Sequence, residues 1–132
     1  MQDGYLTIVT EVDGTENRVS CPAKIEYSAL SAVLRYQDQN AEVTISVAGD
    51  EVIVDRKGDY GLYLPLKEKE TTTGTLSIGG NEGPVEIYTE RLVYTIGKNT
   101  LLMQLHYSLL FGSEKQEMRL RIHAKQNHLE EK

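Results

Sequence analysis

Apolar residues recur at every second position through most of this chain, and this alternation restricts the fold more than any other feature. The clearest run is residues 101–111, in which every odd position is apolar while the even row includes Gln104 and His106. A period of two places successive side chains on opposite faces of a strand. Residues 101–111 are therefore predicted to form a strand with one buried face.

A second alternating run, residues 118–124, follows after the dipeptide Gly112-Ser113. Gly accepts the positive φ that the first position of a type II′ turn requires, so the dipeptide predicts a tight hairpin. Closing this turn with Phe111 opposite Glu114 fixes the register of the two strands. One face then carries four apolar pairs, Tyr107–Met118, Leu105–Leu120, Met103–Ile122 and Leu101–Ala124. The turn and the pattern agree on which face is buried.

The rest of the chain repeats the pattern in runs separated by residues typical of turns. The apolar rows include Leu6 to Val12, Ile25 and Tyr27, Val43 to Val47, Val52 and Val54, and Tyr60 to Leu66. Turns rich in Gly, Asn, Asp and Ser lie at 13–14, 28–31, 37–40, 49–50, 57–59, 79–83 and 97–99. This spacing predicts nine or ten short strands, with 79–83 as a long hairpin loop.

One row changes phase along its length. Val85 and Ile87 occupy odd positions, whereas Leu92 and Tyr94 occupy even ones. A single extra residue shifts a strand in this way, so a β-bulge is expected within residues 89–91.

Short connections force successive strands to run antiparallel, and so many strands without a covering helix leave two sheet edges unless the sheet closes. We therefore expect one all-β domain over 1–132, a closed or nearly closed antiparallel meander barrel of eight to ten strands. Its core is expected within 5–124, and the polar residues 125–132 form a tail with at most a short helix at 124–132. A sandwich is the alternative. A barrel of this size is either filled by its own side chains or holds one small ligand.

The composition limits the classes of binding partner and the cellular compartment that we expect. The net charge is −6, from 20 acidic against 14 basic residues, so the field of the chain repels nucleic acid and anionic membranes. No apolar run approaches the roughly 20 residues of a membrane-spanning helix, and the first residues lack the pattern of a secretory signal. A lone cysteine, Cys21, fits a reducing compartment and is interpreted as a small packed hydrophobe. We therefore expect a soluble, cytoplasmic protein.

Four segments, 51–66, 71–78, 85–97 and 100–112, together resemble the YwiB-like family of small bacterial proteins of unknown function. The likeness lies in Arg56-x-Gly58, in Tyr88-Thr89 before Leu92 and Tyr94, and in Leu105-x-Tyr107-x-Leu109 before Gly112. The resemblance implies a lipocalin-like, calycin-type barrel, a bacterial source and a cytoplasmic location. It implies no catalytic or binding residue.

Catalytic and metal signatures are absent from the sequence. There is no G-x-S-x-G motif, and residues 79–83 lack the Lys and Ser or Thr of a phosphate-binding loop. The hairpin register sets His106 opposite Arg119, a poor neighbour for a metal cation, and sets His123 opposite Leu102. Both histidines are interpreted as surface residues, no cofactor or metal is expected, and an enzyme is disfavoured.

The candidate binding residues are Arg56, Tyr60, Tyr94 and Tyr107. Arg56 continues the row of Val52 and Val54, which the pattern points toward the core. A buried guanidinium requires a carboxylate, carbonyls or a bound anion; the alternative is that the strand ends first and Arg56 sits at the rim beside Gly58. The three tyrosines also lie on inward rows, where their hydroxyls can meet a ligand.

Three functions remain open. The first, which we favour, is a binding module for a small, mostly apolar molecule in the barrel mouth, and it predicts a cavity. The second is a structural or interaction barrel with a filled interior, which docks a partner or a second copy of itself. The third is an enzyme. The outer residues Arg119, Arg121 and Lys125 are interpreted as protection of a sheet edge and not as a nucleic-acid stripe.

Overall fold

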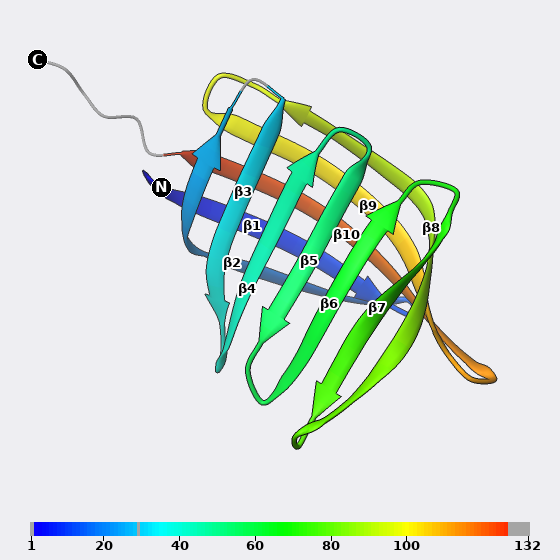
Figure 1. Ribbon diagram of the computed structural model, residues 1–132. Coiled ribbons are helices and arrows are strands. Elements are labelled where there is room, and N and C mark those ends of the chain that lie inside the picture. Colours follow the sequence, from blue (N-terminus) through cyan, green and yellow to red (C-terminus); the bar gives the residue numbers. More distant parts are fainter. Residues whose placement is uncertain (1, 29, 127–132) are drawn as a thin grey trace, which may run out of the picture.

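The computed structural model describes residues 2–28 and 30–126, and in it ten antiparallel strands close into one barrel (Figure 1). The strands are β1 (Gln2–Val12), β2 (Thr15–Tyr27), β3 (Ser31–Asp38), β4 (Ala41–Ala48), β5 (Glu51–Lys57), β6 (Tyr60–Lys67), β7 (Thr71–Ile78), β8 (Asn81–Ile96), β9 (Thr100–Phe111) and β10 (Glu114–Gln126). Each strand pairs with the next in sequence, and β1 closes the barrel against β10. The all-β meander barrel predicted from the sequence is confirmed.

No helix is present among the described residues, and so none of them forms a helix suited to crossing a membrane. The strands are longer than expected, since β8 has 16 residues and β2 and β10 have 13 each. Strand β10 continues to Gln126, two residues past the expected core. Residues 127–132, which hold most of the short helix expected at 124–132, lie outside the described part of the chain.

The last hairpin has the predicted register. Phe111 faces Glu114, the four apolar pairs are in place, and Gly112 has a φ of +62°. The β-bulge is also confirmed, because the β8–β9 ladder shifts between Thr89 and Arg91.

The prediction of a long hairpin loop at residues 79–83 is wrong. Gly79 and Gly80 both have positive φ and form a two-residue turn, with Ile78 paired to Asn81. A turn of this kind needs two residues that accept positive φ, and Gly-Gly supplies both without strain. Strand β8 therefore begins at Asn81 instead of after Gly83.

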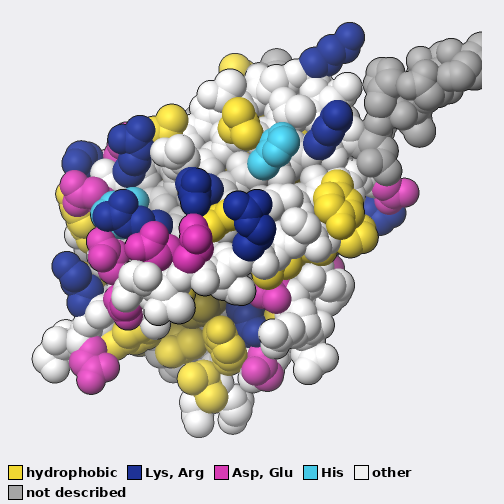
Figure 2. Space-filling view, turned by 180° about the vertical axis from the view of Figure 1, so that it is seen from behind, with side chains coloured by type: hydrophobic (Ala, Val, Ile, Leu, Met, Phe, Trp, Pro, Cys, Tyr) yellow, Lys and Arg dark blue, Asp and Glu magenta, His cyan; other side chains and the backbone are white. Residues whose placement is uncertain are grey.

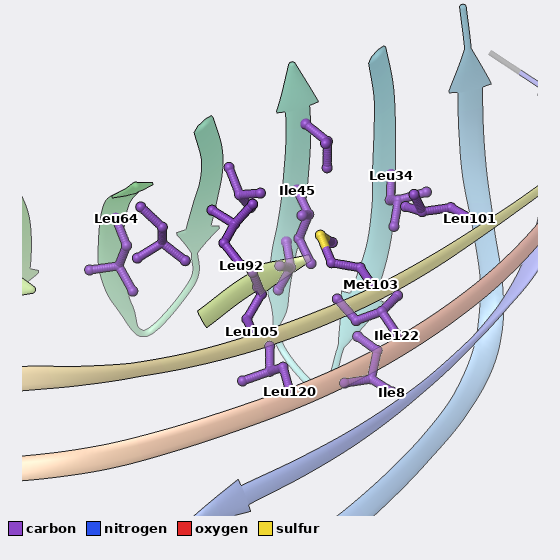
Figure 3. Close-up of a cluster of buried hydrophobic side chains, with 14 of the residues drawn as sticks. Ile8, Leu34, Ile45, Leu64, Leu92, Leu101, Met103, Leu105, Leu120 and Ile122 are labelled. Carbon is purple, nitrogen blue, oxygen red and sulfur yellow. The ribbon is translucent and has the colours of Figure 1, made fainter. Parts of the chain in front are cut away.

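Apolar side chains from opposite walls of the barrel meet at its centre. Leu34 and Ile45 from β3 and β4 point toward Met103 and Ile122 from β9 and β10 (Figure 3). All four of these residues are at most 2% exposed. The middle of the barrel is thus filled by its own side chains.

Two tyrosines bridge distant parts of the wall at one end of the barrel, which we call the closed end. The Tyr94 hydroxyl donates a hydrogen bond to the Gly49 carbonyl in the β4–β5 turn, at 2.7 Å. The Tyr27 hydroxyl donates to the Ala124 carbonyl on β10, at 3.2 Å. Each bond links two strands that are not neighbours in the sheet, so the two side chains tie this end together.

The β2–β3 ladder does not extend to the other end of the barrel. It stops at Lys24, two residues from Pro22. Only four pairs join these strands, from Lys24–Arg35 to Tyr27–Ala32. The two residues that flank a two-residue turn form a hydrogen-bonded pair. Along an antiparallel ladder, hydrogen-bonded pairs then alternate with pairs that are not hydrogen-bonded. Counted from the Asp13-Gly14 turn, the odd residues of β2 bond to β1 and the even residues face β3. Pro22 is the next even residue and has no N–H to donate, so the two strands separate beyond Lys24.

The other two prolines occupy equivalent positions. Pro65 lies two residues beyond Tyr63, the last residue of β6 that pairs with β7. Pro84 lies two residues before Glu86, the first residue of β8 that pairs with β9. At each of these positions, the next hydrogen bond of the ladder would require a backbone N–H that proline lacks. Proline is expected at the end of a sheet ladder for this reason.

Two adjacent leucines on β9 test the assignment of faces. Leu101 is fully buried and Leu102 is 54% exposed. We expect Leu101→Ala to lower the free energy of unfolding by about 2–5 kcal/mol because it leaves a cavity. Leu102→Ala is expected to change it by less than about 0.5 kcal/mol. Urea unfolding of both variants measures this, and equal losses would show that the assignment is wrong.

Pro22 is testable by amide exchange. In Pro22→Ala, the new N–H faces Gln37 in the register of the β2–β3 ladder, and we expect the ladder to extend by one pair. The amide of the introduced alanine should then exchange slowly with deuterium in an NMR experiment. Exchange as fast as that of the exposed amide of Asp50, in the β4–β5 turn, would mean that another contact holds β2 and β3 apart.

Candidate functional site

The separation of β2 from β3 leaves a cavity of about 420 Å³ at the end of the barrel that carries the β3–β4 and β5–β6 turns. We call this cavity the mouth. Seen from behind, hydrophobic side chains gather in a hollow near the lower edge of the molecule (Figure 2). On the outer side of the same gap lies a groove of about 720 Å³ that Cys21, Pro22 and Tyr36 help to line. Tyr36 lines both spaces.

The walls of the mouth are mainly apolar, with a few polar groups. The apolar side chains are Ile8, Val12, Val19, Val43, Val54, Leu62, Leu64 and Met118, and the polar or aromatic ones are Thr10, Thr15, Asn17, Tyr36, Asp38, Arg56, Tyr60 and Tyr107. The apolar set comes from six strands, β1, β2, β4, β5, β6 and β10. This composition is typical of sites that hold a small organic molecule and orient it through a few polar contacts.

Arg56 lies within β5 and lines the mouth, but its guanidinium is turned toward the β5–β6 turn. Nη1 donates to the Tyr60 carbonyl at 2.7 Å, and Nη2 lies 3.1 Å from Oδ1 of Asp59. The guanidinium carbon also lies 3.7 Å from the centre of the Tyr60 ring, a cation–π contact. The strand therefore continues through Arg56, and its charge is paired at the rim.

Two tyrosines reach into the mouth without a protein partner for their hydroxyls. Tyr107 on β9 is 3% exposed, and Tyr36 on β3 is partly buried. Neither hydroxyl is hydrogen-bonded to another described residue. Burial raises the pKa of both phenols well above the usual value of about 10. Both therefore stay neutral at physiological pH and remain able to donate a hydrogen bond to a ligand.

Asp38 lies beside these groups on the inner row of β3. Burial is the main cause of the raised pKa of Tyr36, and the negative charge of the Asp38 carboxylate is the second cause. The pKa of Cys21 is raised by the same two causes in the same order. Both effects place a negative charge close to the gap between β2 and β3. A raised pKa makes Cys21 a poor nucleophile, which agrees with its interpretation as a packed side chain.

Three of the four candidate residues come together, and one does not. Arg56, Tyr60 and Tyr107 line the mouth. Tyr94 lies at the closed end, where its hydroxyl is bonded to Gly49. All four belong to inward rows. The alternation of apolar residues predicts which face of the sheet a side chain lies on, but not its position along the axis of the barrel.

Tyr36 and Asp38 line the mouth but are not among the residues predicted for the site. The sequence predicts a turn at residues 37–40, whereas β3 continues through Asp38 and only Gln39 and Asn40 form the turn. The signal was present in the even row, which runs from Ala32 and Leu34 through Tyr36 to Asp38.

The remaining chemical candidates lie on the outer face. His106 is 2.5 Å from Oε2 of Glu117, and Arg121 donates to Glu16 at 3.1 Å. A groove of about 530 Å³ over β1, β2, β8, β9 and β10 includes His123 and Arg121. Among the described residues, no group of three or more His, Cys, Asp or Glu side chains is placed to hold a metal ion.

Comparison with known proteins places the chain in a family without an assigned activity. The model of a family described as "Domain of unknown function (DUF1934)" matches residues 7–122. The crystal structure of the ywiB protein from Bacillus subtilis is similar with a TM-score of 0.80 at 12% identity, over 96% of this chain and 93% of that chain. At this identity the likeness shows a shared fold alone. No curated protein matches the chain.

The buried tyrosines predict a loss of stability at alkaline pH. Burial raises the pKa of Tyr27 to about 12 and raises those of Tyr36 and Tyr107 as well, whereas tyrosines of the unfolded chain ionise near pH 10. The stability is fully present below pH 10 and falls as pH rises above it, because the unfolded chain ionises first. Urea unfolding between pH 9 and 12 measures the decline. Tyr107→Phe should make it shallower, and an unchanged slope would contradict the burial of Tyr107.

Proposed function

Because the chain belongs to the DUF1934 family, whose function is unknown, we propose its function from the mouth: a non-enzymatic module that binds a small, mostly apolar molecule there. The observation that carries the proposal is a cavity of about 420 Å³ with apolar walls and unpaired tyrosine hydroxyls. Ligand sites in proteins are commonly about 300–1,000 Å³ in volume. The apolar body of the ligand packs against Leu62 and Met118, and its polar end meets Tyr36 and Tyr107.

The filling of the barrel limits the size of the ligand. The core residues occupy the centre, so the ligand stays within the mouth and does not pass through the barrel. A molecule of up to about 17 non-hydrogen atoms suits this space, because each such atom in a packed organic molecule occupies on the order of 20 Å³ and pockets are not filled completely. A long lipid chain is disfavoured on this ground.

The alternative, an interaction barrel with a filled interior, has one observation in its favour. Leu102 and Val93 are 54% and 43% exposed on the outer face of β9 and β8. Both line the outer groove with Arg121 and His123, which offers a surface to a partner or to a second copy. We rank it second because scattered apolar residues are common on protein surfaces, whereas the mouth combines apolar walls with hydroxyls that are free to bond to a ligand.

The proposal includes no cofactor, no nucleic acid and no membrane as a partner. A net charge of −6 supports this exclusion of polyanions, and the lone Cys21 supports residence in the cytoplasm.

Two neighbouring residues of β2 on opposite faces test the binding site. Val19 lines the mouth and Ser20 lies on the outer face, paired with Thr7. The neutral fluorescent probe N-phenyl-1-naphthylamine should bind the unmodified protein with a rise in emission. Val19→Trp is expected to fill the mouth and weaken binding at least tenfold, because the indole takes the space of the probe.

Ser20→Trp, the matched control, should leave the affinity for the probe unchanged. Circular dichroism and urea unfolding confirm that both variants are folded. Absence of probe binding to the unmodified protein, or equal loss in both variants, would refute the mouth as the site.

A further inference from the structure

The charges around the mouth do not balance. Two charged side chains line the mouth, Arg56 and Asp38, and Arg56 is paired with Asp59. Arg56 and Asp59 form an ion pair at 3.1 Å, and the Arg56 side chain is only 17% exposed. The guanidinium further donates to the Tyr60 carbonyl and stacks on the Tyr60 ring. The positive charge is therefore compensated within the β5–β6 turn.

Asp38 has no such compensation. It forms no ion pair with any described residue, and it lines the mouth from the last position of β3. The residue opposite it across the ladder is Ala41, which is fully buried and uncharged. The uncompensated charge of the mouth is thus negative.

Aromatic rings lie beside this carboxylate. Tyr36 is two residues away on the same inner row, and the charge of Asp38 acts on its hydroxyl. Tyr107 lines the same cavity from β9, and the two phenols are close enough for the Tyr107 oxygen also to affect the pKa of Tyr36. An ammonium group is attracted both by a carboxylate and by the faces of such rings. A carboxylate ligand would be repelled by Asp38.

We propose that the ligand is a small amphiphilic organic cation, with an ammonium group held by Asp38 against Tyr36 and Tyr107 and an apolar body against Leu62 and Met118. This inference rests on the proposed function, because it assigns a chemical class to the occupant of the same mouth. A hydrated metal ion is a poorer fit, since Asp38 is the only carboxylate among the described residues that line the cavity.

Three ligands with the same tail and different heads test the sign of the charge. Octylammonium, 1-octanol and octanoate are titrated into the full chain at pH 7 and low salt by isothermal calorimetry. We expect octylammonium to bind about tenfold more tightly than 1-octanol, and octanoate to bind more weakly than either. Added salt should reduce the advantage of octylammonium.

Two variants with equal net charge locate the effect. Asp38→Asn is expected to remove the preference for octylammonium and to leave the affinity for 1-octanol unchanged. The control is Asp50→Asn in the exposed β4–β5 turn at the closed end, which makes the same change in net charge and should leave all three affinities unchanged. The three ligands on the unmodified protein decide the question even where a variant fails to fold.

The possible failures are distinct. Equal binding of the three ligands, or tighter binding of octanoate, would overturn the assignment of a cation while the binding function stands. An octylammonium preference that survives in folded Asp38→Asn would also overturn it. Binding of none of the three ligands, together with no binding of N-phenyl-1-naphthylamine, would overturn the proposed function itself.

Discussion

The continuity of the backbone hydrogen-bond ladder is the constraint on which the rest of the structure depends. A closed barrel satisfies the N–H and C=O groups of every strand, and a residue without an N–H interrupts it. All three prolines stand where a ladder stops, and Pro22 stops the one between β2 and β3 after four pairs. The core fills the middle of the barrel, so this interruption of the wall determines where the interior meets solvent. The mouth is a consequence of where the ladder ends.

The two ends of the barrel use tyrosine in opposite ways. At the closed end, Tyr27 and Tyr94 donate their hydroxyls to backbone carbonyls of distant strands, and these bonds tie the wall together. At the open end, Tyr36 and Tyr107 are as deeply placed but have no acceptor among the described residues. Both hydroxyls are therefore free to bond to a ligand or to water. Both ends contain tyrosines. The end suited to binding is the one whose tyrosine hydroxyls have no hydrogen-bond partner among the described residues.

The sequence predicted what depends on local pattern. The register of β9 and β10 followed from a two-residue turn and an alternating row, and the bulge near Thr89 followed from a change of phase. The first half of β2 was missed, because residues 15–18 are all polar and carry no alternation. The height of a side chain in the barrel was also out of reach, which is why Tyr94 was grouped with Arg56. Height depends on the shear of the whole sheet, a property that no single strand encodes.

Arg56 shows why an inward position alone does not give the chemistry of a site. An arginine on an inner row suggests an anionic ligand, since a buried guanidinium needs a negative partner. Here the chain supplies that partner three residues later, and the short turn between β5 and β6 brings Asp59 to the guanidinium. The charge left for a ligand is then that of Asp38, and the net charge of −6 adds a long-range field of the same sign. The local charge and the global charge therefore both favour a cation, and the steering field and the binding group act in the same direction.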